Sequence, residues 1–334
     1  MADVRAFAPG RVNLIGDHTD YTGGFALPMA VEWGTNVEVE RGGPRVELVS
    51  SSDPDAAVVD LDVADPRTVT PAWARYVAGV VAVLRPGTGA AGRVETTLPV
   101  GAGLSSSAAL EVALALVLGF TGEARELALA CQRAEHLAVG VPSGVMDQLA
   151  CVAGVAGHAL LVDCTSLDVT PVPLPAGVDV VVVHSGRPRA LADSAYAERR
   201  AQCEAAAALV GPLREASDAA VAGLDDGVLR RRARHVVTEN RRVLAFADCL
   251  REGDLVGAGR LMAASHASLA TDFEVSTVAL DALVARLSAE PGVYGARLTG
   301  AGFGGCVVAL ADAESPVRGW RLHPSAGAVR AARG

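Results

Sequence analysis

The sequence predicts an α+β fold of about two domains. Strand-like and helix-like segments follow one another along the 334 residues without the regular strand–helix–strand repeat of a doubly wound sheet. The length suits more than one domain, and 51% hydrophobic residues are enough for a large core. Because only 4% of the residues are aromatic, we expect that core to consist mostly of alanine, valine and leucine.

Short strand-like runs and turns make up the first third of the chain. Residues 37–40 and 46–49 have strand composition, and the Gly-Gly-Pro sequence at 42–44 predicts a hairpin turn between them. The acidic stretch 53–71 is expected to be irregular. Residues 73–84 then show a helical pattern.

A strand, a loop and two helices are expected next. The strand at 93–98 leads into a glycine- and serine-rich loop at 99–107. Residues 108–120 are apolar on nearly every face, which predicts a buried helix. A second helix is predicted at 123–139, since its apolar residues form one stripe and Gly140 follows directly.

A second domain is predicted to begin near Val169, which divides the chain into residues 1–168 and 169–334. The valine-rich run at 178–183 predicts a buried strand. Helices are predicted at about 193–209, 226–251 and 254–271, followed by a strand, a glycine loop and a strand at 295–298, 299–305 and 306–310.

Lysine is absent, so all 29 basic residues are arginine. Any cation beside a phosphate must therefore be an arginine, a metal ion or a helix N-terminus. A Walker A loop, which requires lysine, is excluded. The net charge of −9 argues against a nucleic-acid partner, and the arginine-rich run at 230–235 is interpreted as a solvated or ion-paired helix face.

The cysteines and the hydropathy indicate a cytoplasmic, soluble protein without a membrane partner. The six cysteines form no CxxC pair and are expected to be buried and reduced. The N-terminus carries Asp3 and Arg5 and lacks an apolar signal segment. No uncharged apolar stretch reaches the roughly 18 residues that span a bilayer.

The first cluster with chemical content is the segment 9–24. It contains Arg11, Asp17, His18, Asp20 and four glycines within sixteen residues. Carboxylate and imidazole groups supply the paired donors and acceptors that suit a polyol such as a sugar, and glycines allow close backbone approach. A plain polar turn is the alternative, but it does not require so many ionisable groups.

The second cluster, 98–109, ends in three serines at the start of the predicted buried helix. Unpaired N–H groups and the helix dipole at such a terminus favour an anion, and serine hydroxyls bind phosphate oxygens or magnesium. The alternative is an ordinary serine N-cap. Because one serine suffices for a cap, three serines after a Gly-x-Gly sequence favour phosphate.

The third cluster, 298–306, matches GxGxxG but leads into a strand, which is the wrong context for a dinucleotide fold. A tight glycine turn is an equally good interpretation. Two carboxylates, Glu135 and Asp147, also stand out. Taken singly, each is best interpreted as a solvated surface charge, but their apolar neighbours argue against that interpretation.

In their order along the chain, the three clusters resemble the GHMP kinases, a family named for galactokinase, homoserine kinase, mevalonate kinase and phosphomevalonate kinase. The first cluster resembles the galactokinase signature in particular, as do residues 71–84 and 323–328. The resemblance covers nearly the whole chain. It implies an N-terminal domain similar to ribosomal protein S5, a ferredoxin-like C-terminal domain, and an active site between them.

The resemblance also implies a role for each matching residue. Asp147 matches the catalytic base, and Arg11 matches the arginine that stabilises the transition state beside it. The implied sugar-binding residues are Asp17, His18, Thr19, Asp20, Gly144 and Tyr196. The implied ATP-binding residues are Ser50, Gly101, Ala102, Gly103, Leu104, Ser105, Ser106 and Ser107, and the implied magnesium ligands are Ser107 and Glu135.

The implied reaction transfers a phosphoryl group from ATP, with Mg²⁺, to the anomeric hydroxyl of galactose, in a monomeric enzyme. Without lysine, Mg²⁺, Arg11 and the loop N–H groups must supply the positive field that phosphoryl transfer needs. Asp147 is expected to stay ionised beside Arg11 and to accept the hydroxyl proton.

The sugar preference stays open because Asp17 stands where most relatives carry glutamate. A side chain one methylene shorter reaches about 1.5 Å less far. One alternative is a sister kinase for arabinose, fucose, glucuronate or an N-acetylated hexosamine. Another is a regulatory sensor that binds ATP and galactose without catalysis, although the presence of Arg11, Asp147 and residues 105–107 favours an enzyme. A mevalonate-type kinase is disfavoured by the missing lysine.

Overall fold

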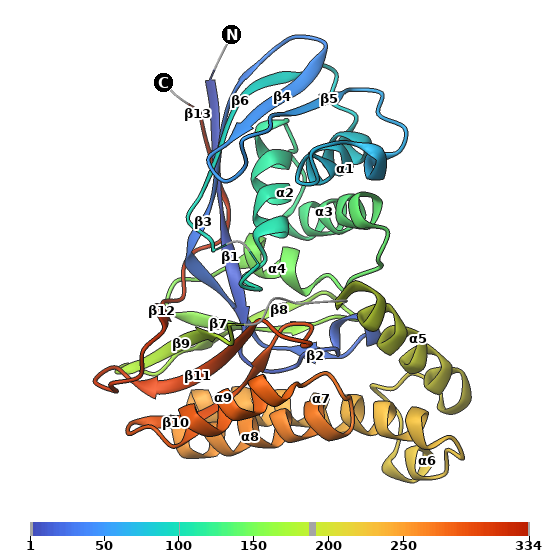
Figure 1. The fold of residues 1–334 in the computed structure, drawn as a ribbon, viewed down its shortest axis with the longest axis vertical. Helices are drawn as coiled ribbons and strands as arrows, with labels where there is room; N and C mark the ends of the chain where they lie inside the picture. Colours follow the sequence, from blue (N-terminus) through green and yellow to red (C-terminus); the bar gives the residue numbers. More distant parts are fainter. Residues whose placement is uncertain (1–2, 100, 187–191, 333–334) are drawn as a thin grey trace.

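The residues that the structure describes form an α+β fold with three sheets, and this α+β class agrees with the prediction from the sequence (Figure 1). The computed structural model describes residues 3–99, 101–186 and 192–332. The large sheet has the order β13-β1-β3-β6-β4-β5, the second has β10-β11-β9-β12, and the small one has β2-β7-β8. The strands of the large sheet are β1 (Asp3–Asn13), β3 (Pro28–Arg41), β4 (Arg45–Ser50), β5 (Ala57–Asp60), β6 (Ala90–Thr96) and β13 (Val329–Ala332). The others are β2 (Phe25–Ala26), β7 (His158–Asp163), β8 (Val169–Pro173), β9 (Val178–His184), β10 (Val293–Thr299), β11 (Cys306–Asp312) and β12 (Trp320–Leu322).

The helices form two groups, one against the large sheet and one against the second sheet (Figure 1). Beside the first sheet lie α1 (Ala74–Leu84), α2 (Ser106–Val117), α3 (Ala124–Val139) and α4 (Met146–Ala153). Below the second sheet or beside it lie α5 (Ala192–Val210), α6 (Asp218–Ala222), α7 (Gly227–Glu252), α8 (Leu255–Thr271) and α9 (Val278–Ser288). No helix in the described residues combines the length and the apolar character required to cross a membrane.

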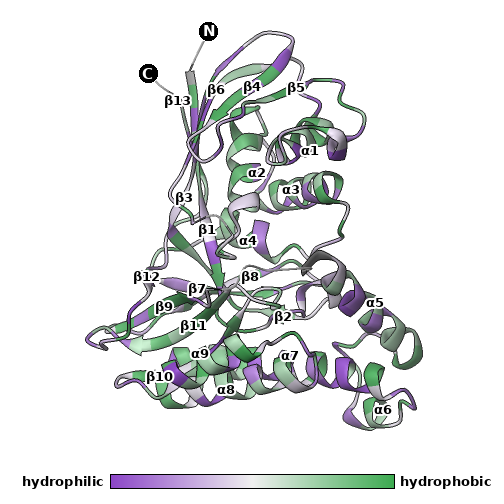
Figure 2. Ribbon diagram, in the orientation of Figure 1, coloured by the Kyte–Doolittle hydropathy of each residue, from purple (hydrophilic) through white to green (hydrophobic). Residues whose placement is uncertain are grey.

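The predicted helices agree with the structure to within a few residues, and α4, α6 and α9 were not predicted. Helix α2 is apolar along nearly its whole length, as Figure 2 shows, and most of its residues are buried. Helix α3 buries the predicted stripe of Leu127, Cys131, Ala134 and Ala138, and it ends at Gly140 with a φ of 74°.

The predicted hairpin at 42–44 is wrong, because β6 lies between β3 and β4. Gly42 donates its N–H to the carbonyl of Gly89 at 2.9 Å, and Gly89 donates back to Gly43 at 2.9 Å. The glycines therefore pair with the start of β6, and β4 runs parallel to β6. The stretch 53–71 is not wholly irregular either, since its residues 57–60 form β5 with alternate side chains buried.

The valine run of β9 is explained by two hydrophobic cores, one on each face of its sheet. Val178, Val180 and Val182 belong to the first core, which continues into the large sheet, while Val181 belongs to the second. β11 alternates in the same way, because successive side chains of a strand point to opposite faces. Val169 begins β8, which pairs with β7, and the domain division there stays a prediction.

A close contact between α8 and β10 depends on glycine. A Cβ atom on Gly259 would lie 1.8 Å from the backbone oxygen of Tyr294. We expect Gly259→Ala to lower the free energy of unfolding by about 2 kcal/mol, because the helix must move away from the strand. Urea unfolding followed by circular dichroism measures this change.

The matched control is Gly227→Ala at the start of α7. A Cβ there would meet only the ends of arginine side chains, at 3.8 Å. This control should be neutral or slightly stabilising, because alanine restricts the unfolded chain. Equal effects of the two substitutions would contradict the assignment of a packing constraint to Gly259.

Candidate active site

Three neighbouring hollows with volumes of about 160, 380 and 330 Å³ lie in a row. The middle hollow shares with the smallest one the residues Arg11, Glu135, Ser143, Asp147, Tyr196 and Ala301. It shares with the third one Tyr76, Ser106 and Ser107. The shared walls make the three hollows one elongated cleft, in which residues from β1, α2, α3, α4 and α5 meet.

Arg11 and Asp147 form a bidentate ion pair where the smallest hollow meets the middle one. Arg11 follows the bulge in β1, and Asp147 lies in the first turn of α4. Nε of Arg11 donates to Oδ1 of Asp147 at 2.7 Å and Nη2 donates to Oδ2 at 2.5 Å. Burial lowers the pKa of Arg11, but the charge and hydrogen bonds of Asp147 outweigh it, so the net shift is upward. Arg11 therefore remains a cation.

The loop before α2 is held by the same arginine. Nη1 of Arg11 donates to the carbonyl of Gly103 at 2.7 Å. Ser105 has a φ of 57°, in the left-handed region that favours glycine, and its hydroxyl donates to Oδ2 of Asp147 at 2.5 Å. Because Ser105 makes no side-chain capping bond to the described backbone of α2, the interpretation as an ordinary N-cap fails for it.

The remaining residues predicted to bind nucleotide divide into two groups. Gly101, Gly103 and the serines at 105–107 line the middle hollow. Ala102 and Leu104 are buried, and the Leu104 carbonyl accepts the N–H of Arg11 at 3.1 Å, so these two contribute backbone only. Val100 of the same loop lies outside the described residues.

The carboxylate of Glu135 accepts hydrogen bonds from three side chains at the middle hollow. It accepts from the hydroxyl of Ser107 at 2.9 Å, the hydroxyl of Ser143 at 3.1 Å and Nε2 of Gln148 at 2.8 Å. The described residues contain no group of three or more histidine, cysteine or acidic side chains able to hold a metal. A hydroxyl beside a carboxylate nevertheless fits Mg²⁺, which takes few protein ligands and completes its shell with phosphates and water.

Asp20, Gly144 and Tyr196 form the wall of the smallest hollow. A Cβ atom on Gly144 would lie 1.8 Å from Oδ2 of Asp20, so only glycine leaves room for this carboxylate. Burial, and next the charge of Asp147, raise the pKa of Asp20 to about 7. The N–H of Gly144 bonds to the Tyr196 hydroxyl, and burial keeps the pKa of this phenol well above 10.0.

The carboxylate of Asp17 is held from behind the hollow. Nη2 of Arg297 donates to one oxygen at 2.5 Å, and the N–H of Gly300 donates to the other at 2.8 Å. Arg297 is fully buried, and the sequence analysis missed it because no local motif marks a residue in the middle of a strand. The glycine loop at 300–305 thus contributes to the site as a tight turn tied to Asp17.

His18 and Thr19 are buried next to Asp17. Nε2 of His18 lies 3.2 Å from the carbonyl oxygen of Ala301 and Nδ1 lies 3.0 Å from the hydroxyl of Tyr21. Because a carbonyl only accepts, the proton is on Nε2, and burial, followed by the nearby His235, lowers the pKa of His18 to about 3. Thr19 is fully buried with its hydroxyl turned to loop carbonyls, so it supports the loop and does not reach the cleft.

The third hollow contains Ser50 together with residues that the sequence analysis did not select. Trp73 and Tyr76 line it from the start of α1, and Ser52, Asp53, Thr96 and Leu110 complete much of its wall. An aromatic pair beside small polar groups suits a flat heterocycle. The sequence does contain a signal for Trp73 and Tyr76, because residues 71–84 resemble the family. No residue of that segment was predicted to bind the nucleotide.

Family models match along the chain. A galactokinase galactose-binding signature matches residues 2–41, the GHMP kinases N terminal domain matches 75–155, and the GHMP kinases C terminal matches 246–321. The galactokinase of Roseiflexus sp. (strain RS-1) is 45% identical over 329 residues, which cover 92% of this chain and 83% of that protein. The chain belongs to the galactokinase family of GHMP kinases.

Other relatives agree with this assignment. Human galactokinase is 45% identical, with 92% of this chain and 83% of the relative covered. The structure of Lactococcus lactis galactokinase complexed with galactose matches with a TM-score of 0.91 and 32% identity, over 98% of this chain and 95% of that one. A mevalonate kinase at 17% identity and a TM-score of 0.66 shares the fold. The predicted family and the two-domain GHMP fold are confirmed, and membership in this sugar-kinase family makes ATP the co-substrate.

The raised pKa of Asp20 predicts a pH-dependent stability. The folded protein holds a proton that the unfolded chain releases near pH 3.8, so Asp20 reduces stability progressively as pH rises from about 4 to about 7. Asp20→Asn removes this loss. We expect the melting temperature of the ligand-free variant, relative to the wild type, to increase between pH 5 and pH 8.

Asp163→Asn is the control with the opposite sign. Hydrogen bonds from Arg214 lower the pKa of Asp163 to about 2, so its stabilisation is present above pH 3.8 and is lost as pH falls through about 2. The melting temperature of this variant at pH 8 should therefore be lower than that of the wild type. A difference between Asp20→Asn and the wild type that stays constant from pH 5 to pH 8 would contradict the assignment.

Proposed function

We propose that the protein transfers the γ-phosphoryl group of ATP to the anomeric hydroxyl of D-galactose, giving α-D-galactose 1-phosphate and ADP. The observation that carries this proposal is the Arg11–Asp147 pair, which lies where the smallest hollow meets the middle one. A base at that junction faces a sugar on one side and a phosphate on the other. The galactose complex of the Lactococcus lactis relative supports the choice of sugar.

In this proposal Asp147 accepts the proton of the anomeric hydroxyl and Arg11 stabilises the charge that develops on the transferred group. The ion pair and the Ser105 hydroxyl fix both carboxylate oxygens, so the base is oriented before substrate binds. The backbone N–H groups at 101–107 and the start of α2 add positive potential to the middle hollow, in a chain without lysine.

Ser107 and Glu135 would hold Mg²⁺ in the middle hollow. Their hydroxyl and carboxylate are hard oxygen ligands, and Ser143 and Gln148 orient the Glu135 carboxylate. The bound ion would neutralise charge on the phosphates. The base of the nucleotide would then occupy the hollow beside Ser50, Trp73 and Tyr76.

The sugar would occupy the hollow formed by Asp20, Gly144 and Tyr196, with Asp17 and His18 behind it. Each Asp17 oxygen already accepts one bond but retains a second lone pair for a hydroxyl. Because Asp17 is shorter than glutamate, a sister sugar preferred over galactose is the second candidate. We further propose a monomer with its division near residue 168, acting in the cytoplasm.

The decisive experiment is a panel of free sugars incubated with Mg-ATP, with ADP release as the readout, for the wild type and Asp147→Asn. We expect turnover on galactose and a loss of about 10³-fold in the variant, the size of a general-base contribution. Turnover on a different sugar would support the kinase activity and make Asp17 the candidate determinant of the sugar preference. Galactose binding without turnover on any sugar would favour the sensor.

Glu135→Gln tests the proposed magnesium ligand. We expect the Mg²⁺ concentration that gives half-maximal turnover to rise about tenfold or more, while the affinity for galactose measured without nucleotide stays unchanged. The matched control is Glu95→Gln, an exposed residue on the large sheet. An unchanged magnesium requirement in Glu135→Gln would remove this residue from the metal site.

A further inference from the structure

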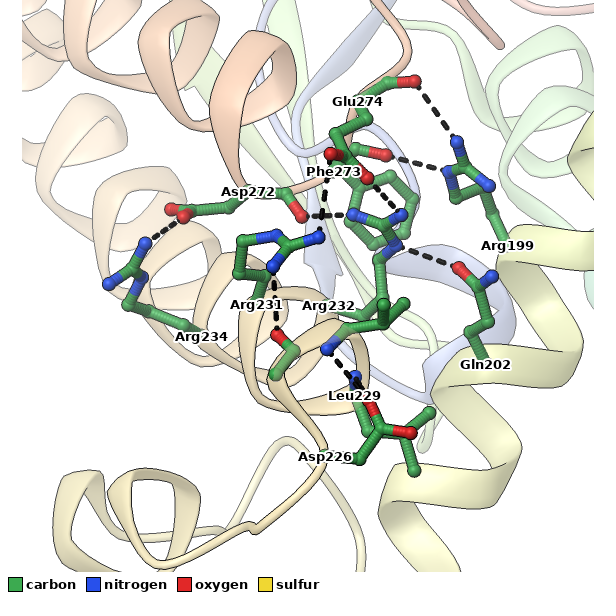
Figure 3. Close-up of polar contacts among 12 residues, drawn as sticks. Arg199, Gln202, Asp226, Leu229, Arg231, Arg232, Arg234, Asp272, Phe273 and Glu274 are labelled. Atoms are coloured by element: carbon green, nitrogen blue, oxygen red, sulfur yellow. Dashed lines mark hydrogen bonds and ion pairs between the residues drawn. The ribbon is translucent and has the colours of Figure 1, made fainter.

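The turn at residues 272–275, between α8 and α9, is held by arginines from two other helices (Figure 3). Arg199 extends from α5, and Arg232 extends from α7. Both are buried, with 9% and 2% of the residue exposed. The arginine-rich run at 230–235 is thus an ion-paired helix face, as predicted, and part of it lies in the interior.

The two arginines bind the turn mainly through its backbone. Nε of Arg199 donates to the carbonyl of Phe273 at 2.7 Å, and Nη2 donates to the carbonyl of Glu274 at 3.1 Å. Nη1 of Arg232 donates to the carbonyl of Asp272 at 2.5 Å, and Nη2 pairs with the Glu274 carboxylate. Glu274 has a φ of 56°, and these bonds stabilise that left-handed conformation.

The same arginines position α5, the helix that carries Tyr196. Arg199 lies three residues after Tyr196, one turn along the helix. Nε of Arg232 donates to Oε1 of Gln202, a further turn along, at 2.7 Å. Any displacement of the turn is therefore transmitted to the helix that places the Tyr196 ring at the sugar hollow.

The other side of the turn supports the back of that hollow. The Phe273 ring lies between the rings of His18 and His235, with centroid distances of 4.7 and 4.6 Å. The carbonyl of Val275 accepts the N–H of Phe303 at 2.8 Å, which anchors the glycine loop carrying Ala301. His18 and Ala301 both line the hollow and are joined to each other.

We propose that Arg199 and Arg232 are positioning residues for the sugar, which hold the turn at 272–275 against α5 and so fix Tyr196, His18 and Ala301 around the hollow. The inference rests on the proposed sugar-binding end of the cleft, but not on catalysis by Asp147. Two buried guanidinium groups are costly to desolvate, and of the two only Arg232 pairs with the carboxylate of Glu274, whereas apolar side chains would stabilise a plain helix junction equally well.

The test compares Arg199→Met and Arg232→Met with the wild type by calorimetric titration of galactose and, separately, of a non-hydrolysable ATP analogue with Mg²⁺. We expect the galactose Kd to rise about tenfold or more, equivalent to the loss of one or two hydrogen bonds from a charged donor. The nucleotide Kd should stay within about twofold. Arg199→Lys should be intermediate, because an ammonium group reaches one of the two carbonyls.

Arg234→Met is the matched control. Arg234 lies on the same helix as Arg232 and pairs with the side chain of Asp272, but its side chain is 57% exposed and makes no hydrogen bond to the described residues of α5. It should leave both affinities unchanged. If Arg199→Met does not fold, Arg199→Lys and Glu274→Gln, which removes the carboxylate that pairs with Arg232, are expected to show the same selective loss.

Three results would overturn the inference: an unchanged galactose Kd with a lowered melting temperature, equal losses of sugar and nucleotide affinity, or an equal effect of Arg234→Met. These results differ from a failure of the proposed function. A wild type that binds galactose without turnover would refute the reaction while the titrations remain decisive. If the wild type uses another sugar, that sugar replaces galactose in the titrations, and a wild type that binds no sugar would refute both proposals.

Discussion

One bidentate ion pair, between Arg11 and Asp147, connects two parts of this site that are far apart in sequence. Its partners are 136 positions apart and lie on β1 and α4. The third nitrogen of the same guanidinium holds the loop before α2 through Gly103, and Ser105 binds the same carboxylate. In a chain without lysine, a planar cation with five donors can orient a base and a phosphate loop together, which a point charge cannot.

The sugar end of the cleft depends on buried polar groups that satisfy one another. Asp17 is paired with Arg297 and the N–H of Gly300, and the neutral His18 ring uses both of its nitrogens. Such groups are stable in the interior only when hydrogen-bonded, so each one restricts the position of the next. The result is a preorganised wall, supported by the 272–275 turn, rather than a set of independent contacts.

The same cleft contains two groups whose arrangement is unfavourable for folding stability. Asp20 is partly buried beside the charge of Asp147, and Ser105 adopts a backbone conformation that favours glycine. Both arrangements reduce stability, and both orient an oxygen toward the cleft or its base. Strain and unfavourable charge are typical of sites shaped for a ligand, where preorganisation for binding is obtained at the expense of folding stability.

The sequence by itself determined the α+β class, most of the helices, the family and the residues of the three clusters, because these features depend on local composition and spacing. The buried stripe of α3 and the valine run of β9 are examples in which period and burial agree. Only the tertiary structure decided which strands pair, as the insertion of β6 between β3 and β4 shows. A glycine turn specifies a bend but not the partner that completes the sheet.

Tertiary structure also decided which predicted site residues face the cleft. Thr19 and Leu104 belong to the right motifs but are buried, whereas Arg297 and the arginines behind Tyr196 contribute from segments without a motif. Supporting residues act through distance and hydrogen bonds across the fold, and a single sequence contains no signal for such contacts. Residue types and their spacing identify the chemistry, while the packing of distant elements fixes its geometry.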